Sequence, residues 1–234
     1  MLFRSEDLDS GIGILLAELD RLGLASHTVV IYTSDNGGRS PLLKGGKTLV
    51  DEGGIRVPLI VRGPGIPAAS HCPEPVVGYD ILPTVLDWAD AGDRVPSGVE
   101  GGSWKPVLMG GGTGRVVRPV DRLVFHHDVE VEHLQTALRQ GNLKLVHHWD
   151  TRRSYLYDLS KDLGERNDLS VERPEETRRL LALLEDHVSK GLGDGSVARL
   201  RGETSASGEI PGGRSARKGR RDFGGGKGRV GTDR

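Results

Sequence analysis

A run of β-branched and aromatic residues, Val29-Val30-Ile31-Tyr32-Thr33, follows an amphipathic helical pattern after a short loop. The helical pattern places apolar residues at spacings of three and four, which predicts one apolar stripe, capped by Ser5 and ended at Gly23. The stripe consists of Leu8, Ile12, Leu15, Leu16, Leu19 and Leu22. A strand that is apolar on both faces is typical of a buried parallel sheet. Helix followed by strand therefore predicts an α/β layer.

Further elements are expected along the chain. Residues 55–61 predict a second strand, which Pro58 restricts to an edge or a bulge. A helix is expected from Asp80 to Ala91, and the Gly- and Pro-rich residues 93–120 predict a loop. Four short strand patterns follow, and Pro174 begins a helix with an apolar face. The strand patterns are residues 123–126, 137–139, 143–147 and 155–158, and the helix face is Leu180, Leu181, Leu184 and Val188. This second region predicts a small antiparallel sheet covered by one helix.

The charge of the chain is unevenly distributed. Residues 191–234 contain ten Lys/Arg against five Asp/Glu, together with 13 glycines. Such a segment has too little apolar surface to offset the entropy of ordering, so we expect a disordered basic tail. A nucleic-acid or acidic-polymer role for this tail is the open alternative. The expected domains are thus 1–120, an α/β domain; 121–190, an antiparallel subdomain; and 191–234, the tail.

The single cysteine excludes an intrachain disulfide framework. No apolar run reaches the length of a membrane span, and no signal-peptide pattern follows Met1.

The residues after the first strand, Ser34-Asp35-Asn36-Gly37-Gly38, suggest a ligand site. Ligands of open α/β sheets bind beyond the carboxyl ends of strands. The carboxylate of Asp35 and the amide oxygen of Asn36 are hard ligands that suit Ca²⁺ or Mg²⁺. Taken alone, Asp-Asn-Gly-Gly is also a good turn sequence.

A second motif lies shortly downstream. Lys47 follows two glycines, and a lysine exposed in this way can reach the oxygens of a sulfate or phosphate. Glu52 and Arg56 could pair beneath such a site. The alternative is a set of solvated loop charges.

Together these segments resemble the C-terminal half of the type I sulfatase family, within the alkaline phosphatase superfamily, over roughly residues 5–190. The likeness is nearest to its arylsulfatase and N-acetylhexosamine-sulfatase members. The matching segments are LDSGIGILLAELDRLGLA, VVIYTSDNGG, GGKTLVDEGGIRVPLIVRGPG, YDILPTVLDWA, GGSWKPVL, LRQGNLKLV and YLYDLSKDLGERNDL. The resemblance implies an α/β, alkaline-phosphatase-like sheet with flanking helices, present in part, and a small C-terminal antiparallel sheet packed on one helix.

The resemblance also implies roles for particular residues. Asp35 and Asn36 match a pair of calcium ligands, and Lys47 matches the lysine that holds the sulfate and stabilises the departing oxygen. The implied activity is hydrolysis of the sulfate esters of sugars or aryl groups. Members are often secreted, periplasmic or lysosomal, which leaves the compartment of this chain open.

The family's nucleophile is a formylglycine made in a C/S-x-P-x-R motif, and this motif is absent here. Cys72 is followed directly by Pro73 and lacks the required arginine, so we interpret it as a loop cysteine. We therefore expect the isolated chain to be inactive.

Several alternatives stay open: a non-catalytic sulfate- or glycan-binding remnant, an incomplete reading frame and a phosphoesterase. Near the end of the 123–126 strand, His126 and His127 are candidate substrate contacts. For these two and His133, exposed loop positions or metal binding are the alternatives.

Overall fold

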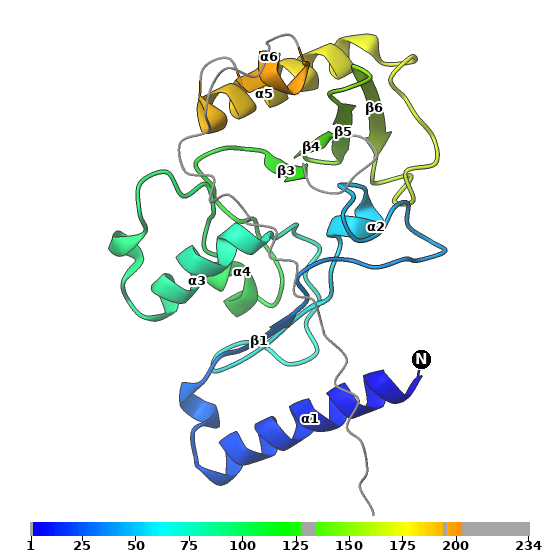
Figure 1. The fold of residues 1–234 in the computed structure, drawn as a ribbon. Helices are drawn as coiled ribbons and strands as arrows, with labels where there is room; N and C mark the ends of the chain where they lie inside the picture. The colour runs from blue at the N-terminus through cyan, green and yellow to red at the C-terminus, as the bar shows by residue number, and fades with distance from the viewer. Residues whose placement is uncertain (1, 128–133, 194–195, 203–234) are drawn as a thin grey trace, which may run out of the picture.

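The computed structural model describes residues 2–127, 134–193 and 196–202. The described chain contains a two-stranded sheet, a four-stranded sheet and helices around them (Figure 1). The α-helices are α1 (Leu2–Arg21), α2 (Glu52–Ile55), α3 (Ile81–Trp88), α4 (Lys105–Met109), α5 (Pro174–Leu192) and α6 (Ser196–Leu200). The 3₁₀ helices are η1 (Ala25–His27), η2 (Gly78–Asp80) and η3 (Gly92–Arg94). The strands are β1 (Val30–Thr33), β2 (Leu59–Arg62), β3 (Leu123–His127), β4 (Gln135–Gln140), β5 (Leu143–His148) and β6 (Arg153–Asp158).

The first helix and strand form where the sequence predicts them, but their surroundings differ from the prediction. The helical backbone of α1 begins at Leu2, so Ser5 lies inside the helix and does not cap it. The apolar stripe of α1 is largely uncovered, with Leu15 68% exposed. Figure 1 shows α1 set apart from the two sheets.

The expectation that the first strand lies in a parallel sheet is wrong for the described chain. β1 pairs antiparallel with β2, with Val30 opposite Arg62 and Thr33 opposite Leu59. β2 is the only neighbour of β1 among the described residues, so one edge of β1 carries unpaired backbone groups. Residues 52–55 form the short helix α2, which includes the first residue of the strand predicted over 55–61. β2 begins only after Pro58, at Leu59.

The four-stranded sheet agrees closely with the sequence. It has the order β3-β4-β5-β6 and is antiparallel throughout. Gly141 turns β4 into β5 with a φ of 59°, in the left-handed region that glycine adopts without strain. One face of the sheet packs on α5 through a core of apolar side chains. Its fully buried members are Leu138, Leu145, Trp149, Leu156, Leu180 and Leu184.

Two segments expected to lack regular structure contain helices. α4 lies within residues 93–120, and its Val107 packs with Trp104 and Val116 beneath β1 and β2. α6 lies in the segment expected to be a disordered tail, and its Val197 and Leu200 pack on the α5 core. Each of these helices has only five residues, which is too short to show a helical periodicity in the sequence. Residues 203–234 of the expected tail lie outside the described part of the chain. None of the helices in the described ranges combines the length and the hydropathy that a membrane span requires.

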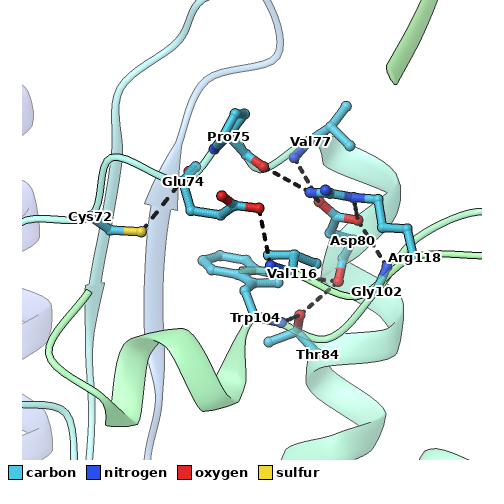
Figure 2. Close-up of polar contacts among 10 residues, drawn as sticks. All are labelled: Cys72, Glu74, Pro75, Val77, Asp80, Thr84, Gly102, Trp104, Val116 and Arg118. Atoms are coloured by element: carbon cyan, nitrogen blue, oxygen red, sulfur yellow. Dashed lines mark hydrogen bonds and ion pairs between the residues drawn. The ribbon is translucent and has the colours of Figure 1, made fainter. Parts of the chain in front are cut away.

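A buried carboxylate connects the α3 region to the loops around it (Figure 2). Asp80 is fully buried, and its two oxygens accept the backbone N–H groups of Val77 and Gly102, each at 2.9 Å. The guanidinium of Arg118 donates to the same carboxylate at 2.9 and 2.6 Å. Trp104 and the hydroxyl of Thr84 donate to the carbonyl oxygen of Asp80. The Asp80 side chain therefore connects the segments of Val77, Gly102 and Arg118, and its backbone carbonyl holds Thr84 and Trp104.

We predict that Asp80→Asn destabilises the chain by roughly 3 kcal/mol, because it leaves the nearly buried Arg118 without its counter-charge. Urea unfolding monitored by circular dichroism measures the loss. Asp93→Asn, at an exposed position in η3, is the matched control and should change stability by less than about 0.5 kcal/mol. Equal midpoints for the two variants would contradict the structural role of Asp80.

We further predict an acid-sensitive contribution from His147. Its ring is 2% exposed, Nδ1 bonds the Ser154 hydroxyl at 2.9 Å, and Nε2 has no partner among the described residues. Burial, with help from the positive charge of Arg201, lowers the pKa of His147 to about 4. The unfolded chain, whose histidine pKa is about 6.5, therefore binds more protons between pH 6.5 and 4, and stability falls as pH falls through that window.

The loss should reach about 3 kcal/mol at most near pH 4. His147→Gln keeps a polar side chain that does not titrate, so its free energy of unfolding should vary less with pH over this window. The measurement is urea unfolding of both proteins at several pH values. Parallel curves would show that His147 does not carry the effect.

Candidate functional site

The Asp35-Asn36 loop begins where β1 ends. Asp35 is exposed and Asn36 is half-buried. Asp35 Oδ1 accepts the backbone N–H of Asn36 at 3.0 Å and lies 3.4 Å from the Ser34 hydroxyl. The Ser34 hydroxyl also donates to the carbonyl oxygen of Asn36 at 3.0 Å. These short bonds hold the loop to its own backbone and leave Asp35 Oδ2 and the Asn36 amide available to a ligand.

Two glycines bring this loop against α2. The N–H of Gly37 donates to the carbonyl oxygen of Gly54 at 2.7 Å. A Cβ at position 37 would lie 2.1 Å from the carbonyl oxygen of Gly53, and one at Gly54 would lie 1.9 Å from that of Leu49. Neither position can hold a side chain without moving the backbone. The Asp-Asn-Gly-Gly and Glu-Gly-Gly motifs therefore contact each other through backbone that only glycine permits.

The two lysines of the following loop have different surroundings. Lys44 donates to the Tyr157 hydroxyl at 3.0 Å, and it pairs with Asp51 at 3.1 Å. Burial acts to lower the pKa of Lys44, but the Tyr157 hydrogen bond and the Asp51 charge outweigh it and raise the pKa. Lys47 is exposed and takes part in no hydrogen bond or ion pair of the described residues. Thr48 beside it has a φ of 76°, a strained value for a β-branched residue.

A buried ion network fixes α2 to the C-terminal sheet. The ammonium of Lys144, on β5, is fully buried and lies 3.0 Å from Glu52 and 2.8 Å from Glu165. Glu165 also accepts the backbone N–H of Glu52 at 2.7 Å. The predicted Glu52–Arg56 pair is present, with Nε of Arg56 3.0 Å from Glu52 Oε2. Two carboxylates thus face two cations.

The pKa values of the two carboxyl groups shift in opposite directions. Burial acts to raise the pKa of Glu52, but the charges of Lys144 and Arg56 outweigh it, and the net shift is downward. For Glu165, burial raises the pKa by more than Lys144 lowers it. Glu52 is therefore the carboxylate that stays ionised most firmly, while Glu165 is the one that protonates first as the pH falls.

A cavity of about 870 Å³ opens beside the Asp35-Asn36 loop. It is lined by residues of β1, α2 and β2, by the 70–78 segment and by the start of the C-terminal sheet. Asp35, Asn36, Arg56 and Arg139 all face it. Lys47 does not line this cavity. The structure therefore joins the backbones of the two motifs without placing the Lys47 side chain beside Asp35.

The other sequence-based candidates lie elsewhere. His126 is exposed on β3, bonds the Thr136 hydroxyl through Nδ1 at 2.7 Å and lines neither the cavity beside the Asp35-Asn36 loop nor a second one near Arg118. His127 ends β3, but its side chain and all of His133 lie outside what the structure describes. Cys72 is half-buried in the cavity wall, 3.9 Å from the carbonyl oxygen of Glu74, which is consistent with a loop cysteine. The substrate role of the histidines stays a prediction.

Sequence reasoning missed Lys144, Glu165 and the Asp80–Arg118 pair. Lys144 falls in a strand pattern where a lysine is normally solvent-exposed, so its burial leaves no local signal. Its carboxylate partners are distant in the chain. The one signal, which concerns the strand rather than the lysine, is the adjacent apolar pair Leu145 and Val146. Because successive strand residues point to opposite faces, this pair indicates a strand that is covered on both faces.

The residues present fit a hard cation in kind but only partly in number. Asp35 and Asn36 supply a carboxylate and an amide oxygen, whereas Ca²⁺ takes about 6–8 oxygen ligands. Within the described ranges, no group of three or more His, Cys, Asp or Glu side chains is arranged to hold a metal ion. A complete site would need further oxygens from water, from substrate or from other polypeptide.

Known proteins with similar sequence and fold are sulfatases. The sulfatase family profile matches residues 5–91. N-acetylglucosamine-6-O-sulfatase of Bacteroides thetaiotaomicron is 33% identical over 193 residues, which covers 76% of this chain and 33% of that protein. Arylsulfatase A of Homo sapiens is 31% identical over 238 residues, which covers 86% of this chain and 46% of that protein.

The fold gives the same result. One similar solved structure is that of a protein in complex with its substrate D-glucosamine-2-N,6-O-disulfate. Its sequence is 28% identical to this chain, and the two structures superpose with a TM-score of 0.63. The superposition covers 78% of this chain and 38% of that one. The chain therefore spans between a third and a half of the length of these relatives. The expected alkaline-phosphatase-like fold is confirmed. By sequence and by fold, the chain belongs to the sulfatase family.

Proposed function

We propose that this chain contributes the cation-binding and sulfate-holding part of a site for the metal-dependent hydrolysis of sulfate esters. The observation that carries the proposal is the Gly37–Gly54 hydrogen bond. It connects the loop of Asp35 and Asn36 to the segment that bears the unpaired Lys47. Oxygen ligands for a cation and a free ammonium thus come from two adjoining loops.

Asp35 and Asn36 would hold Ca²⁺, or Mg²⁺ in its place, through their side-chain oxygens. The bound cation supplies Lewis-acid polarisation of the sulfate group. Lys47 would bind a sulfate oxygen and stabilise the negative charge that grows on the leaving oxygen. Because no carboxylate among the described residues pairs with Lys47, its full charge is available to an anion.

The relatives suggest the class of substrate. Their names specify aryl, steryl and N-acetylglucosamine 6-O-sulfate esters, and one solved relative holds a disulfated glucosamine. We propose a sulfated carbohydrate or an aryl sulfate for this chain.

The nucleophile is the missing component. Cys72 lacks the sequence context for conversion to formylglycine, and it is packed into the cavity wall. We therefore propose that the chain alone binds sulfate without hydrolysing it, and that turnover needs a polypeptide that carries the C/S-x-P-x-R motif. The uncovered edge of β1 and the exposed face of α1 are where such a polypeptide could pack.

A second candidate function is a sulfate- or glycan-binding remnant with no catalytic partner. The small number of cation ligands among the described residues favours it.

We predict that sulfate binding by the chain has a Ca²⁺-dependent component. Isothermal titration calorimetry with sodium sulfate, with Ca²⁺ and then with a chelator, measures this component. Lys47→Ala and Asp35→Ala should each weaken it roughly tenfold or more, because each removes a charge-assisted contact. Lys161→Ala, at an exposed position in the loop after β6, is the matched control.

The same samples should show no hydrolysis of an aryl sulfate. Turnover by the chain alone that is lost in Lys47→Ala would overturn the claim that a separate nucleophile is needed. Unchanged Ca²⁺-dependent binding in both site variants would contradict the proposed function itself.

We also predict that Glu165 positions the Lys47 segment. Glu165→Gln weakens the contacts to Lys144 and to the N–H of Glu52, so α2 and its loop should open more often. Amide hydrogen exchange at Gly53, which bonds the Lys44 carbonyl at 2.7 Å, should then speed up about tenfold, equivalent to about 1.4 kcal/mol. Glu175→Gln, exposed on α5, is the control. Equal protection in both variants would show that Glu165 does not hold this segment.

A further inference from the structure

A second cavity, of about 290 Å³, has an unusual concentration of arginines in its walls. It lies between the segment 115–123 and the β4–β5 turn, and we name it the arginine pocket. Its guanidinium groups belong to Arg115, Arg118, Arg122 and Arg139. Figure 2 shows one wall of it, where Glu74, Pro75 and Val116 lie close to Arg118.

The arginines differ in how well they are satisfied. Arg118 is neutralised by Asp80, and it also donates to the carbonyl oxygen of Pro75 at 2.8 Å. Arg139 uses its Nε on the carbonyl oxygen of Gly141 at 3.0 Å and has no carboxylate partner among the described residues. Arg122 has a buried Nε that donates to nothing the structure describes. Arg115 is exposed and also lacks a described partner.

The acidic side chains nearby do not cancel these charges. Glu74 and Asp121 line the pocket, and one oxygen of Glu74 already accepts the N–H of Val116 at 3.0 Å. Asp186 of α5 feels the charge of Arg122, but no ion pair joins the two. Three guanidinium groups that lack a salt bridge thus face two carboxylates. Burial lowers the pKa of Arg139 by more than the charges of Glu52 and Glu74 raise it.

An oxyanion would satisfy these groups. A buried N–H without an acceptor costs free energy, and a bound anion supplies that acceptor. Guanidinium groups present paired N–H donors that match the oxygens of sulfate, carboxylate or phosphate. Neither a cation nor an apolar ligand would use the unpaired donors.

The arginine pocket adjoins the larger cavity of the candidate site. Glu74, Pro75, Leu123 and Arg139 line both. A ligand that extends from the Asp35-Asn36 loop along the larger cavity would therefore also meet Arg139, which lines both cavities. A saccharide with more than one sulfate group is a ligand that carries an anion for each of the two cavities.

We propose that the arginine pocket is a second anion site, which binds a sulfate group other than the one held by Lys47. The inference rests on the proposed function for its substrate class, a multiply sulfated saccharide. The pocket itself stands on its own contacts, so it binds sulfate without Ca²⁺ and without Lys47.

The test is isothermal titration calorimetry of the full chain with sodium sulfate in a chelator, in a Lys47→Ala background. Sulfate should still bind, and Arg122→Gln and Arg139→Gln should each weaken binding roughly tenfold or more. Arg178→Gln, an exposed arginine of α5, should bind like the parent. Arg139→Lys, which keeps the charge but loses the paired donors, should fall between parent and Arg139→Gln. Circular dichroism checks that each variant is folded.

Three results would overturn the inference. The first is loss of all chelator-resistant sulfate binding in Lys47→Ala, which would place the anion at Lys47 and leave the proposed function intact. The second is unchanged binding in folded Arg122→Gln and Arg139→Gln. The third is acetate binding as tightly as sulfate, which would assign the pocket to carboxylates. Failure of Ca²⁺-dependent binding alone would instead contradict the proposed function and leave the arginine pocket standing.

Discussion

The Lys144 ammonium is the contact on which the arrangement of the site depends. A fully buried lysine is costly unless carboxylates compensate its charge, and here both Glu52 and Glu165 contact it. Glu52 belongs to α2 and Glu165 to the loop after β6, so one cation on β5 holds three distant segments together. Removing any member would leave an uncompensated charge in the interior. The loop that carries Lys47, which leads into α2, is therefore attached to the C-terminal sheet by ion pairs more than by apolar packing.

The glycines of the two motifs complete what the ion network begins. With Glu52 held in place, the backbone of residues 37, 53 and 54 lies so close to neighbouring backbone carbonyl groups that no side chain fits there. The chain can then keep Asp35 and Lys47 exposed, and Asn36 half-buried, while their loops are held in place by the ion network and the close backbone contacts. The exposed apolar stripe of α1 and the outer edge of β1, in contrast, are not covered by other described residues. Apolar and hydrogen-bonding groups are left without partners there, in a chain that spans less than half the length of the relatives compared.

Sequence periodicity predicted the elements that are locally determined. The hairpins of the four-stranded sheet and the α5 face follow from alternation, turn residues and heptad-like spacing. The parallel sheet expected for β1 was wrong, because the residues of one strand do not determine which strand pairs with it or in which direction. α4 and α6 were missed because their helical form depends on packing against Trp104 and the α5 core. The ligand motifs could be placed on loops, but the ion network that holds those loops joins residues 92 and 113 positions apart.

Pairing separates the structural charges of this chain from the available ones. Lys44, Lys144 and Arg118 resemble Lys47, Arg115 and Arg122 in the sequence, and composition cannot divide the two sets. In the structure the first three contact carboxylates, whereas the second three have no carboxylate partner among the described residues. Carboxylates already neutralise the cations of the first set, so an anion would gain little by binding there. At the second set it would complete contacts that the fold leaves open. The proposed sulfate sites therefore use cations that have no carboxylate partner among the described residues.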